Sequence, residues 1–186
     1  MAFLLGDGVI NLTPAEAKTR KIPFRSLDQK QVSTLDFLSD AIVPGAKSAG
    51  LSHFIDHQLS APYEDNLLIL RYLRVNPPFK NFYASALKAF ERSARLKYNK
   101  SPLDLSKVEI SEFISIMMQK NPAGWPESEK ESEKESEKGI PPAPFFYFVL
   151  RSDAIDVTYG TVNSFDSMDI PYMAHIEPSH PWETPS

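Results

Sequence analysis

The last third of this 186-residue chain most constrains its fold, because an aromatic segment is followed by a tail with no regular pattern. Residues 145–150 read Phe-Phe-Tyr-Phe-Val-Leu, whereas residues 162–186 show neither the 3.6-residue period of a helix nor the alternation of a strand. Disordered tails are normally poor in large apolar residues, since they have no surface on which to bury them. This tail is rich in prolines and in large apolar side chains: Phe165, Met168, Ile170, Tyr172, Met173, Ile176 and Trp182. We therefore expect an extended tail that lies on a surface, either of its own helices or of another chain.

Composition excludes several kinds of chemistry. The chain has no cysteine, so it cannot form disulfides, thiolate zinc sites or iron–sulfur ligation by itself. Of the net charge of −4, residues 127–138 contribute −3 through six Glu and three Lys, which leaves no basic excess for binding nucleic acid. No apolar run approaches the roughly 20 residues of a membrane span, so we expect none. The first residues lack the basic start and apolar stretch of a secretory signal.

Hydrophobic spacing predicts an all-α fold, an irregular bundle of about six helices. Ser26 and Gln29 have the spacing of a capping box, as do Ser106 and Glu109. No strand alternation and no glycine-rich phosphate loop is evident. The aromatic helix is apolar on almost all sides, which predicts a central position or cover by another chain. The expected helices are one from Ser26 to before Pro44, one over 51–59, one that Pro62 opens and that reaches Leu73, one over about 78–98, one starting at Ser106, and one over roughly 144–159 that Gly160 ends in a left-handed turn.

The chain reads as a single helical domain over residues 1–186. Residues 1–25 form an irregular N-terminal arm, since Pro14 and Pro23 break any long helix. Residues 121–143 form a low-complexity insert loop, which contains three Glu-Ser-Glu-Lys repeats. Mixed charges favour a solvated loop for these repeats, and a docking arm for a basic partner is the alternative. Residues 162–186 form the extended interface tail.

Two histidine-containing arrangements are candidates for chemistry. His53 and His57 stand four residues apart on one helix face, the spacing of metal ligands, with a third ligand available from His175 or His180. The hydrolytic zinc motif needs Glu directly after the first His, and Phe54 stands there instead. Two surface histidines beside an apolar stripe are the alternative interpretation, and we expect no metal site.

In the tail, His175 with Glu177 has the composition of a general base and its carboxylate. The same two residues also fit a polar rim around Tyr172 and Met173, and no nucleophile or cofactor motif lies nearby. The remaining candidates, Arg151, Asp153 and Asp156, are interpreted as charges on a helix surface. The sequence thus assigns no catalytic, cofactor-binding or metal residue to this chain.

Two blocks of the sequence resemble the gluconate 2-dehydrogenase subunit 3 family. Residues 34–46, Thr-Leu-Asp-Phe-Leu-Ser-Asp-Ala-Ile-Val-Pro-Gly-Ala, together with Ala49-Gly50 and residues 54–59, are similar to the opening of that family. Residues 145–161, with Arg-Ser-Asp at 151–153 and Tyr-Gly-Thr at 159–161, and then residues 171–176, are similar to its C-terminal half. The two blocks occur in the same order at opposite ends of the chain, which makes the resemblance fairly specific.

The resemblance implies a non-catalytic small subunit that is not an enzyme on its own. Such subunits stabilise a large flavin-dependent sugar, glycoside or polyol dehydrogenase of the glucose–methanol–choline type, and help to export or complete it. FAD, and in some complexes an iron–sulfur cluster, would belong to the partner, and a cytochrome c subunit often accepts the electrons. The family implies a periplasmic heterodimer, although no twin-arginine leader is seen here, so a cytoplasmic complex is the alternative.

The resemblance and the apolar tail together predict where the large subunit binds. Obligate interfaces are large, apolar and enriched in Tyr, Trp and Met at their centres. Packing of the same side chains on the chain's own bundle is the alternative. A free-standing helical metal-binding or hydrolytic protein, using His53 and His57 or His175 and Glu177, is the competing function. The predicted interface residues are Tyr159, Tyr172, Met173, His175, Ile176 and Trp182.

Overall fold

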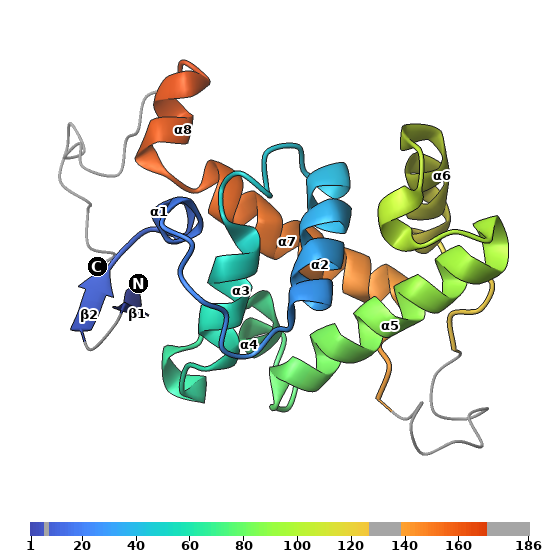
Figure 1. Ribbon diagram of the computed structural model, residues 1–186, viewed down its shortest axis with the longest axis horizontal. Helices are drawn as coiled ribbons and strands as arrows, with labels where there is room; N and C mark the ends of the chain where they lie inside the picture. The colour runs from blue at the N-terminus through green and yellow to red at the C-terminus, as the bar shows by residue number, and fades with distance from the viewer. Residues whose placement is uncertain (6–7, 127–138, 171–186) are drawn as a thin grey trace, which may run out of the picture.

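The computed structural model describes residues 1–5, 8–126 and 139–170, and it is mostly helical (Figure 1), which confirms the predicted fold class. In the described residues one two-stranded sheet precedes the helices. The elements are β1 (Ala2–Leu5), β2 (Gly8–Asn11), α1 (Pro14–Thr19), α2 (Gln29–Ile42), α3 (Leu51–Leu59), the 3₁₀ turn η1 (Tyr63–Asp65), α4 (Ile69–Tyr72), α5 (Phe79–Tyr98), the 3₁₀ turn η2 (Pro102–Asp104), α6 (Lys107–Met117), α7 (Ala143–Tyr159) and α8 (Val162–Ser167).

The aromatic helix α7 has the central position that its apolar sequence predicts. It contacts α2, α3, α4 and α6, and Figure 1 shows it passing behind α2 and α3. Phe146, Val149 and Leu150 on α7 are fully buried, and Phe146 lies within 6.3 Å of the rings of Phe82 and Tyr83 on α5. Burying each such side chain stabilises the fold by about 2–3 kcal/mol relative to leaving it exposed. The aromatic rings therefore join α5 to α7 within the core.

Capping explains where two of the helices begin. The predicted capping box of Ser106 and Glu109 is present at the start of α6. The one predicted at Ser26 and Gln29 is wrong: α2 begins two residues later, with Asp28 as its cap and Gln31 as the reciprocal partner. The reason is that the backbone N–H of Ser26 donates to the Asp56 carboxylate on α3 (2.8 Å), so this segment is tied to α3 before the helix starts.

The third expected helix, opened by Pro62, is replaced by η1, a short extended stretch and the four-residue α4. Asn66 interrupts the helix, since its buried side chain donates to Gln58 O (2.6 Å) and accepts from the Leu68 N–H (3.0 Å). Short polar side chains compete with helical hydrogen bonds in this way. Gly160 follows α7 as expected, but its φ is −80°, so the predicted left-handed turn is wrong.

The N-terminal arm is more ordered than its prolines suggest. β1 and β2 form an antiparallel hairpin that pairs Ala2 with Asn11, and α1 follows with Pro14 at its first position. Proline is well tolerated there, because the first N–H of a helix has no intrahelical partner. The arm, which we expected to be extended or irregular with no long helix, thus contains two short strands and one short helix. The arm buries its own small apolar cluster of Phe3, Leu12, Ala17 and Ile22.

Beyond α7, residues 162–167 form the short helix α8 instead of the extended chain that we expected for the start of the tail. Thr161 caps it, accepting from the Ser164 N–H (3.3 Å). Residues 127–138 of the insert and 171–186 of the tail lie outside the described residues. Among the residues that the structure describes, no helix has the length and hydrophobicity required to span a membrane.

Candidate functional site

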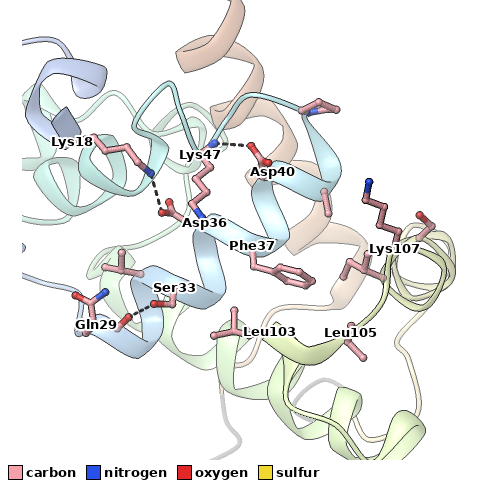
Figure 2. Close-up of a pocket in the computed structure, with 15 residues that line it drawn as sticks. Lys18, Gln29, Ser33, Asp36, Phe37, Asp40, Lys47, Leu103, Leu105 and Lys107 are labelled. Atoms are coloured by element: carbon pink, nitrogen blue, oxygen red, sulfur yellow. Dashed lines mark hydrogen bonds and ion pairs between the residues drawn. The ribbon is translucent and has the colours of Figure 1, made fainter.

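A groove of about 920 Å³ runs along the outer side of α2, between α2 and the segment formed by η2 and α6. Figure 2 shows Phe37 pointing from α2 toward the side on which Leu103 and Leu105 lie. Leu103 is exposed, Phe37 is half-buried, and Ile110 closes the floor from α6. α2 thus presents one apolar face to the core and a second, partly apolar face to this groove.

Charged groups surround the groove. Lys18 Nζ lies 3.1 Å from Asp36 Oδ2, and the Ser52 hydroxyl donates to the other oxygen of the same carboxylate. The Asp40 carboxylate accepts from the backbone N–H groups of Gly45 and Lys47, both at 3.1 Å. Among the described residues the Lys47 and Lys107 ammonium groups have no ion-pair partner, and Figure 2 shows Lys107 pointing away from the floor. The groove therefore combines an apolar floor with a rim that carries both lysines and aspartates.

A second surface is formed by η1, α4 and the residues around them. We define the Tyr63–Leu73 surface as Tyr63, Leu67, Tyr72 and Leu73, whose side chains are between 40% and 62% exposed, together with Arg71. The Arg71 guanidinium lies 6.0 Å from the centroid of the Tyr63 ring and 5.8 Å from that of Tyr72. Its Nη1 donates to Asn66 O at 3.0 Å. Four large apolar residues within eleven positions are exposed here, and one of them, Tyr63, also has its ring 6.1 Å from that of the core residue Phe79.

The polar group under this surface is Asp153 on α7. It is 1% exposed and accepts from the Tyr83 hydroxyl (2.6 Å) and from the Ile69 N–H at the start of α4 (2.9 Å). Burial raises the pKa of this carboxyl to about 6, against the lowering effect of both hydrogen bonds, and nearby Asp156 raises it further. Burial and the Asp153 charge raise the pKa of Tyr83 well above its ordinary value. The interpretation of Asp153 as a surface charge is therefore wrong.

His53 and His57 lie on the face of α3 that the N-terminal arm covers. His53 Nε2 lies 3.2 Å from Ile22 O and His57 Nε2 lies 2.9 Å from Ala2 O. His53 is buried, so the alternative of two surface histidines is wrong. Burial lowers the pKa of His53, and its contact with Ile22 O opposes that effect. No group of three or more potential metal ligands occurs among the described residues. Both imidazoles therefore hold the arm on α3.

Of the predicted interface residues, the structure describes only Tyr159, which is exposed at the end of α7. The other five, Tyr172, Met173, His175, Ile176 and Trp182, lie outside the described residues, as do Glu177 and His180. Their predicted roles at an interface, in catalysis or in metal binding stay predictions.

Sequence reasoning missed the buried polar side chains. Asp56 accepts from the N–H groups of Arg25, Ser26 and Leu27 at 2.8–2.9 Å, so it fixes the chain that enters α2. A signal for Asp153 was present, since it stands seven residues after Phe146 and therefore on the same helix face as the aromatic core. The sequence signal for Asp56 is weaker. Almost every residue of α3 is buried, so the position of Asp56 on the helix does not single it out as a core residue.

The sequence of the chain was compared with known protein families, with curated proteins and with solved structures. Residues 29–161 match the sequence model of the family described as Gluconate 2-dehydrogenase subunit 3. The match covers more than half of the chain and extends from the first residue of α2 past the end of α7. No curated protein and no solved structure matches the chain. The family description names one subunit of a dehydrogenase, and it agrees with the resemblance seen at residues 34–59 and 145–161. The chain belongs to the gluconate 2-dehydrogenase subunit 3 family.

Proposed function

We propose that this chain is the non-catalytic small subunit of an FAD-dependent dehydrogenase that oxidises a sugar, glycoside or polyol. Its partner is a large subunit of the glucose–methanol–choline oxidoreductase type, with which it forms a heterodimer. The chain stabilises that subunit and assists its export or completion. The observation that carries this proposal is the family match, which includes all the helices from α2 to α7.

The use of buried polar groups supports a structural role. The carboxylate oxygens of Asp56 and Asp153 accept hydrogen bonds from backbone N–H groups and, for Asp153, from the Tyr83 hydroxyl. His53 and His57 each contact a backbone carbonyl of the N-terminal arm. A catalytic acid or base needs to reach a substrate atom, and these groups are occupied inside the fold. The polar chemistry of the described residues therefore serves to shape this subunit.

The uncovered apolar side chains support a permanent partner. Tyr159 is exposed at the end of α7, and Met168 and Ile170 are exposed after α8. They lead directly into the tail that carries the other predicted interface residues, Tyr172, Met173, His175, Ile176 and Trp182. We propose that this tail lies on the large subunit. FAD, any iron–sulfur cluster and the contact with a cytochrome c acceptor then belong to the partner, and the complex works in the periplasm.

Co-expression tests the proposal. The tagged chain is produced together with the products of its neighbouring reading frames, and we expect a stoichiometric complex with a flavoprotein that shows flavin absorbance and oxidises a sugar or polyol. Removal of residues 162–186 should abolish co-purification while the helix content of the purified chain stays the same. A chain that is monodisperse, fully folded and active without any other protein contradicts the proposal. Fractionation of the cells then locates the complex in the periplasm or the cytoplasm.

A further inference from the structure

We infer that the Tyr63–Leu73 surface is an anchor by which this chain holds its catalytic subunit, with Arg71 receiving a carboxylate of that partner. The inference rests on the proposed function and adds a contact site outside the C-terminal tail. It also states the chemistry of the surface that the partner presents: an apolar hollow for Tyr72 and Leu67, with an acidic side chain beside it.

Exposure is the first argument. Tyr72 is 62% exposed and Leu67 51% exposed, whereas their neighbours Leu68 and Leu70 are fully buried. The segment thus divides its apolar residues into two that attach it to the core and a group that faces outward. Singly scattered apolar residues on a surface are ordinary, but here Arg71 links two of them, since it lies 6.0 Å from the Tyr63 ring and 5.8 Å from the Tyr72 ring. Burying such side chains against a partner contributes on the order of 25 cal/mol per Å².

Rigidity is the second argument. The Leu67 N–H donates to Gln58 Oε1 (2.7 Å), the Asn66 side chain to Gln58 O (2.6 Å), and the Ile69 N–H to Asp153 (2.9 Å). Gln58 and Asn66 are each 2% exposed, so these bonds are shielded from water. A segment fixed in advance loses little conformational freedom when it binds, which strengthens the complex without any new contact.

The chemistry of Arg71 is the third argument. Its guanidinium lies beside two tyrosine rings, and one bond to Asn66 O sets its orientation. A guanidinium has five N–H donors arranged to match a carboxylate, so donors remain for a partner. Arg74 is exposed three residues later and adds positive charge, while the exposed Glu64 and Asp65 follow Tyr63 on η1. Arginine and tyrosine are the residues that most often dominate interface energies.

Glu64 and Asp65 balance the charges of Arg71 and Arg74, so the chemistry expected of the partner's surface rests on the Arg71 guanidinium between two tyrosine rings. Positive charge within an apolar cluster is complemented by a carboxylate at the edge of an apolar hollow. The groove along α2 has lysines and aspartates on its rim, but its floor is recessed and it suits a projecting segment of a partner. The Tyr63–Leu73 surface carries its own exposed side chains and therefore suits a hollow. Substitutions at the two places separate these possibilities.

The experiment measures binding of chain variants to the flavoprotein subunit that co-purifies with the unaltered chain, identified by its mass and its flavin absorbance. We expect Tyr72→Ala and Leu67→Ser each to weaken binding at least about 30-fold. Leu96→Ser and Val108→Ser are matched controls, since these side chains are 66% and 78% exposed on α5 and α6. They should change the dissociation constant by less than about threefold. Leu103→Ser tests the groove in the same way.

Arg71 variants test the carboxylate. Arg71→Gln should weaken binding and make it less sensitive to salt, because one charge pair is lost, and Arg71→Lys should restore the salt dependence but only part of the affinity. A purely structural role for Arg71 would leave the salt dependence unchanged. All variants are first shown to keep the helix content and melting temperature of the parent chain.

The outcomes separate the two claims. If the unaltered chain binds the flavoprotein and the Tyr72, Leu67 and Arg71 variants bind it equally well, the anchor is not on this surface and the inference is overturned while the proposed function stands. Weakening by Leu103→Ser alone would place the contact in the groove and also overturn the inference. If the unaltered chain binds no flavoprotein, both the inference and the proposed function fail.

Discussion

At the scale of single residues, buried carboxylates position segments that apolar contacts alone leave free. Asp56 holds the three residues before α2, and Asp153 holds the start of α4. Leaving a buried donor without its acceptor costs about 1–3 kcal/mol, so each carboxylate imposes a specific path on the chain. For Asp153 the imposed path is the one that presents the Tyr63–Leu73 surface.

The raised pKa of Asp153 predicts a pH-dependent contribution to stability. Its folded-state pKa of about 6 lies above the ordinary value of 3.8, so protonation favours the folded chain. The contribution is complete below about pH 4 and is lost as the pH rises through 6. The difference is about 3 kcal/mol, since each pKa unit corresponds to about 1.4 kcal/mol.

The variant Asp153→Asn reveals this contribution, because an amide resembles the protonated acid and does not titrate. We expect the free energy of unfolding of the parent chain, relative to Asp153→Asn, to fall by up to about 3 kcal/mol between pH 4 and pH 7. Urea unfolding at several pH values measures it. Asp104→Asn, at an exposed position, serves as the control. A constant difference across this range would show that Asp153 does not titrate there.

Gly50 shows how a close approach limits the choice of residue. Its φ is +83°, and a Cβ at this position would lie 2.2 Å from the Pro14 carbonyl oxygen at the start of α1. Gly50→Ala should therefore displace the N-terminal arm and destabilise the protein by more than the backbone cost of about 1–2 kcal/mol. Gly139→Ala is the matched control, since its φ is +86° and no atom lies within 4 Å of its Cβ position.

Thermal unfolding and limited proteolysis of both glycine variants measure the contact. We expect Gly50→Ala to lower the melting temperature more than Gly139→Ala and to make residues 1–22 accessible to protease. Equal melting temperatures for the two variants would mean that the arm does not press on Gly50.

At the scale of elements, the sequence predicts those helices whose cause is local. The apolar stripe of α5 and the Ser106–Glu109 capping box of α6 are properties of neighbouring residues, and both elements form as expected. The start of α2 depends on Asp56, which lies 30 residues from Ser26, and the break at Asn66 depends on Gln58, which lies 8 residues away. Such tertiary hydrogen bonds leave no periodic signal in the residues whose structure they decide.

The candidate site also contains features set by neighbouring residues and features set by distant ones. The end of α7 at Tyr159 agrees with the helix expected over roughly 144–159, which follows from local pattern, whereas the interface role of Tyr159 stays a prediction. The Tyr63–Leu73 surface was not predicted from the sequence, because Leu67, Leu70 and Leu73 suggest one buried helical stripe. The interruption at Asn66 leaves the exposed Leu67 outside α4, so it shares no helical stripe with the buried Leu70, and Leu73 is exposed where α4 ends.

The N-terminal arm is the element whose docking should respond to acid. Burial lowers the pKa of His53 below its ordinary 6.5; nearby Lys18 acts in the same direction, and Asp36 and Asp56 oppose it. The stability that neutral His53 contributes is therefore present above pH 6.5 and is lost as the pH falls through the lower folded-state pKa. Acidification from pH 7.5 to 5 is expected to loosen the arm.

Amide hydrogen exchange of residues 1–22, corrected for the intrinsic effect of pH, measures this loosening. We expect faster exchange in the arm at pH 5, and unchanged protection in α5. His53→Gln retains a donor for Ile22 O but does not titrate, so its arm should respond less to pH. An arm that exchanges equally in the parent and in His53→Gln at every pH would contradict the role of His53.

At the scale of the whole molecule, the family match and the local structure agree on what is essential. The match begins at Gln29, so the arm lies outside it, while the core helices and the Tyr63–Leu73 surface lie inside it. The repeats at 127–138 fall within the matched range, but the chain on either side of them is joined by its own contacts. Trp125 Nε1 donates to Pro141 O (3.0 Å), and the Ala143 N–H donates to Asn121 Oδ1 (2.8 Å).

These contacts predict that the repeats are dispensable. Replacing residues 127–138 with Gly-Ser-Gly-Ser removes a charge of −3 and shortens the closed loop, which changes the free energy of unfolding by about 1 kcal/mol or less. We expect the melting temperature and the recovery of the large subunit to stay as in the parent chain. Trp125→Ala is the contrasting variant, because this side chain is 4% exposed and its loss should cost about 3–5 kcal/mol. If the shortened chain folds but no longer recovers the large subunit, the repeats are a docking arm and not a solvated loop.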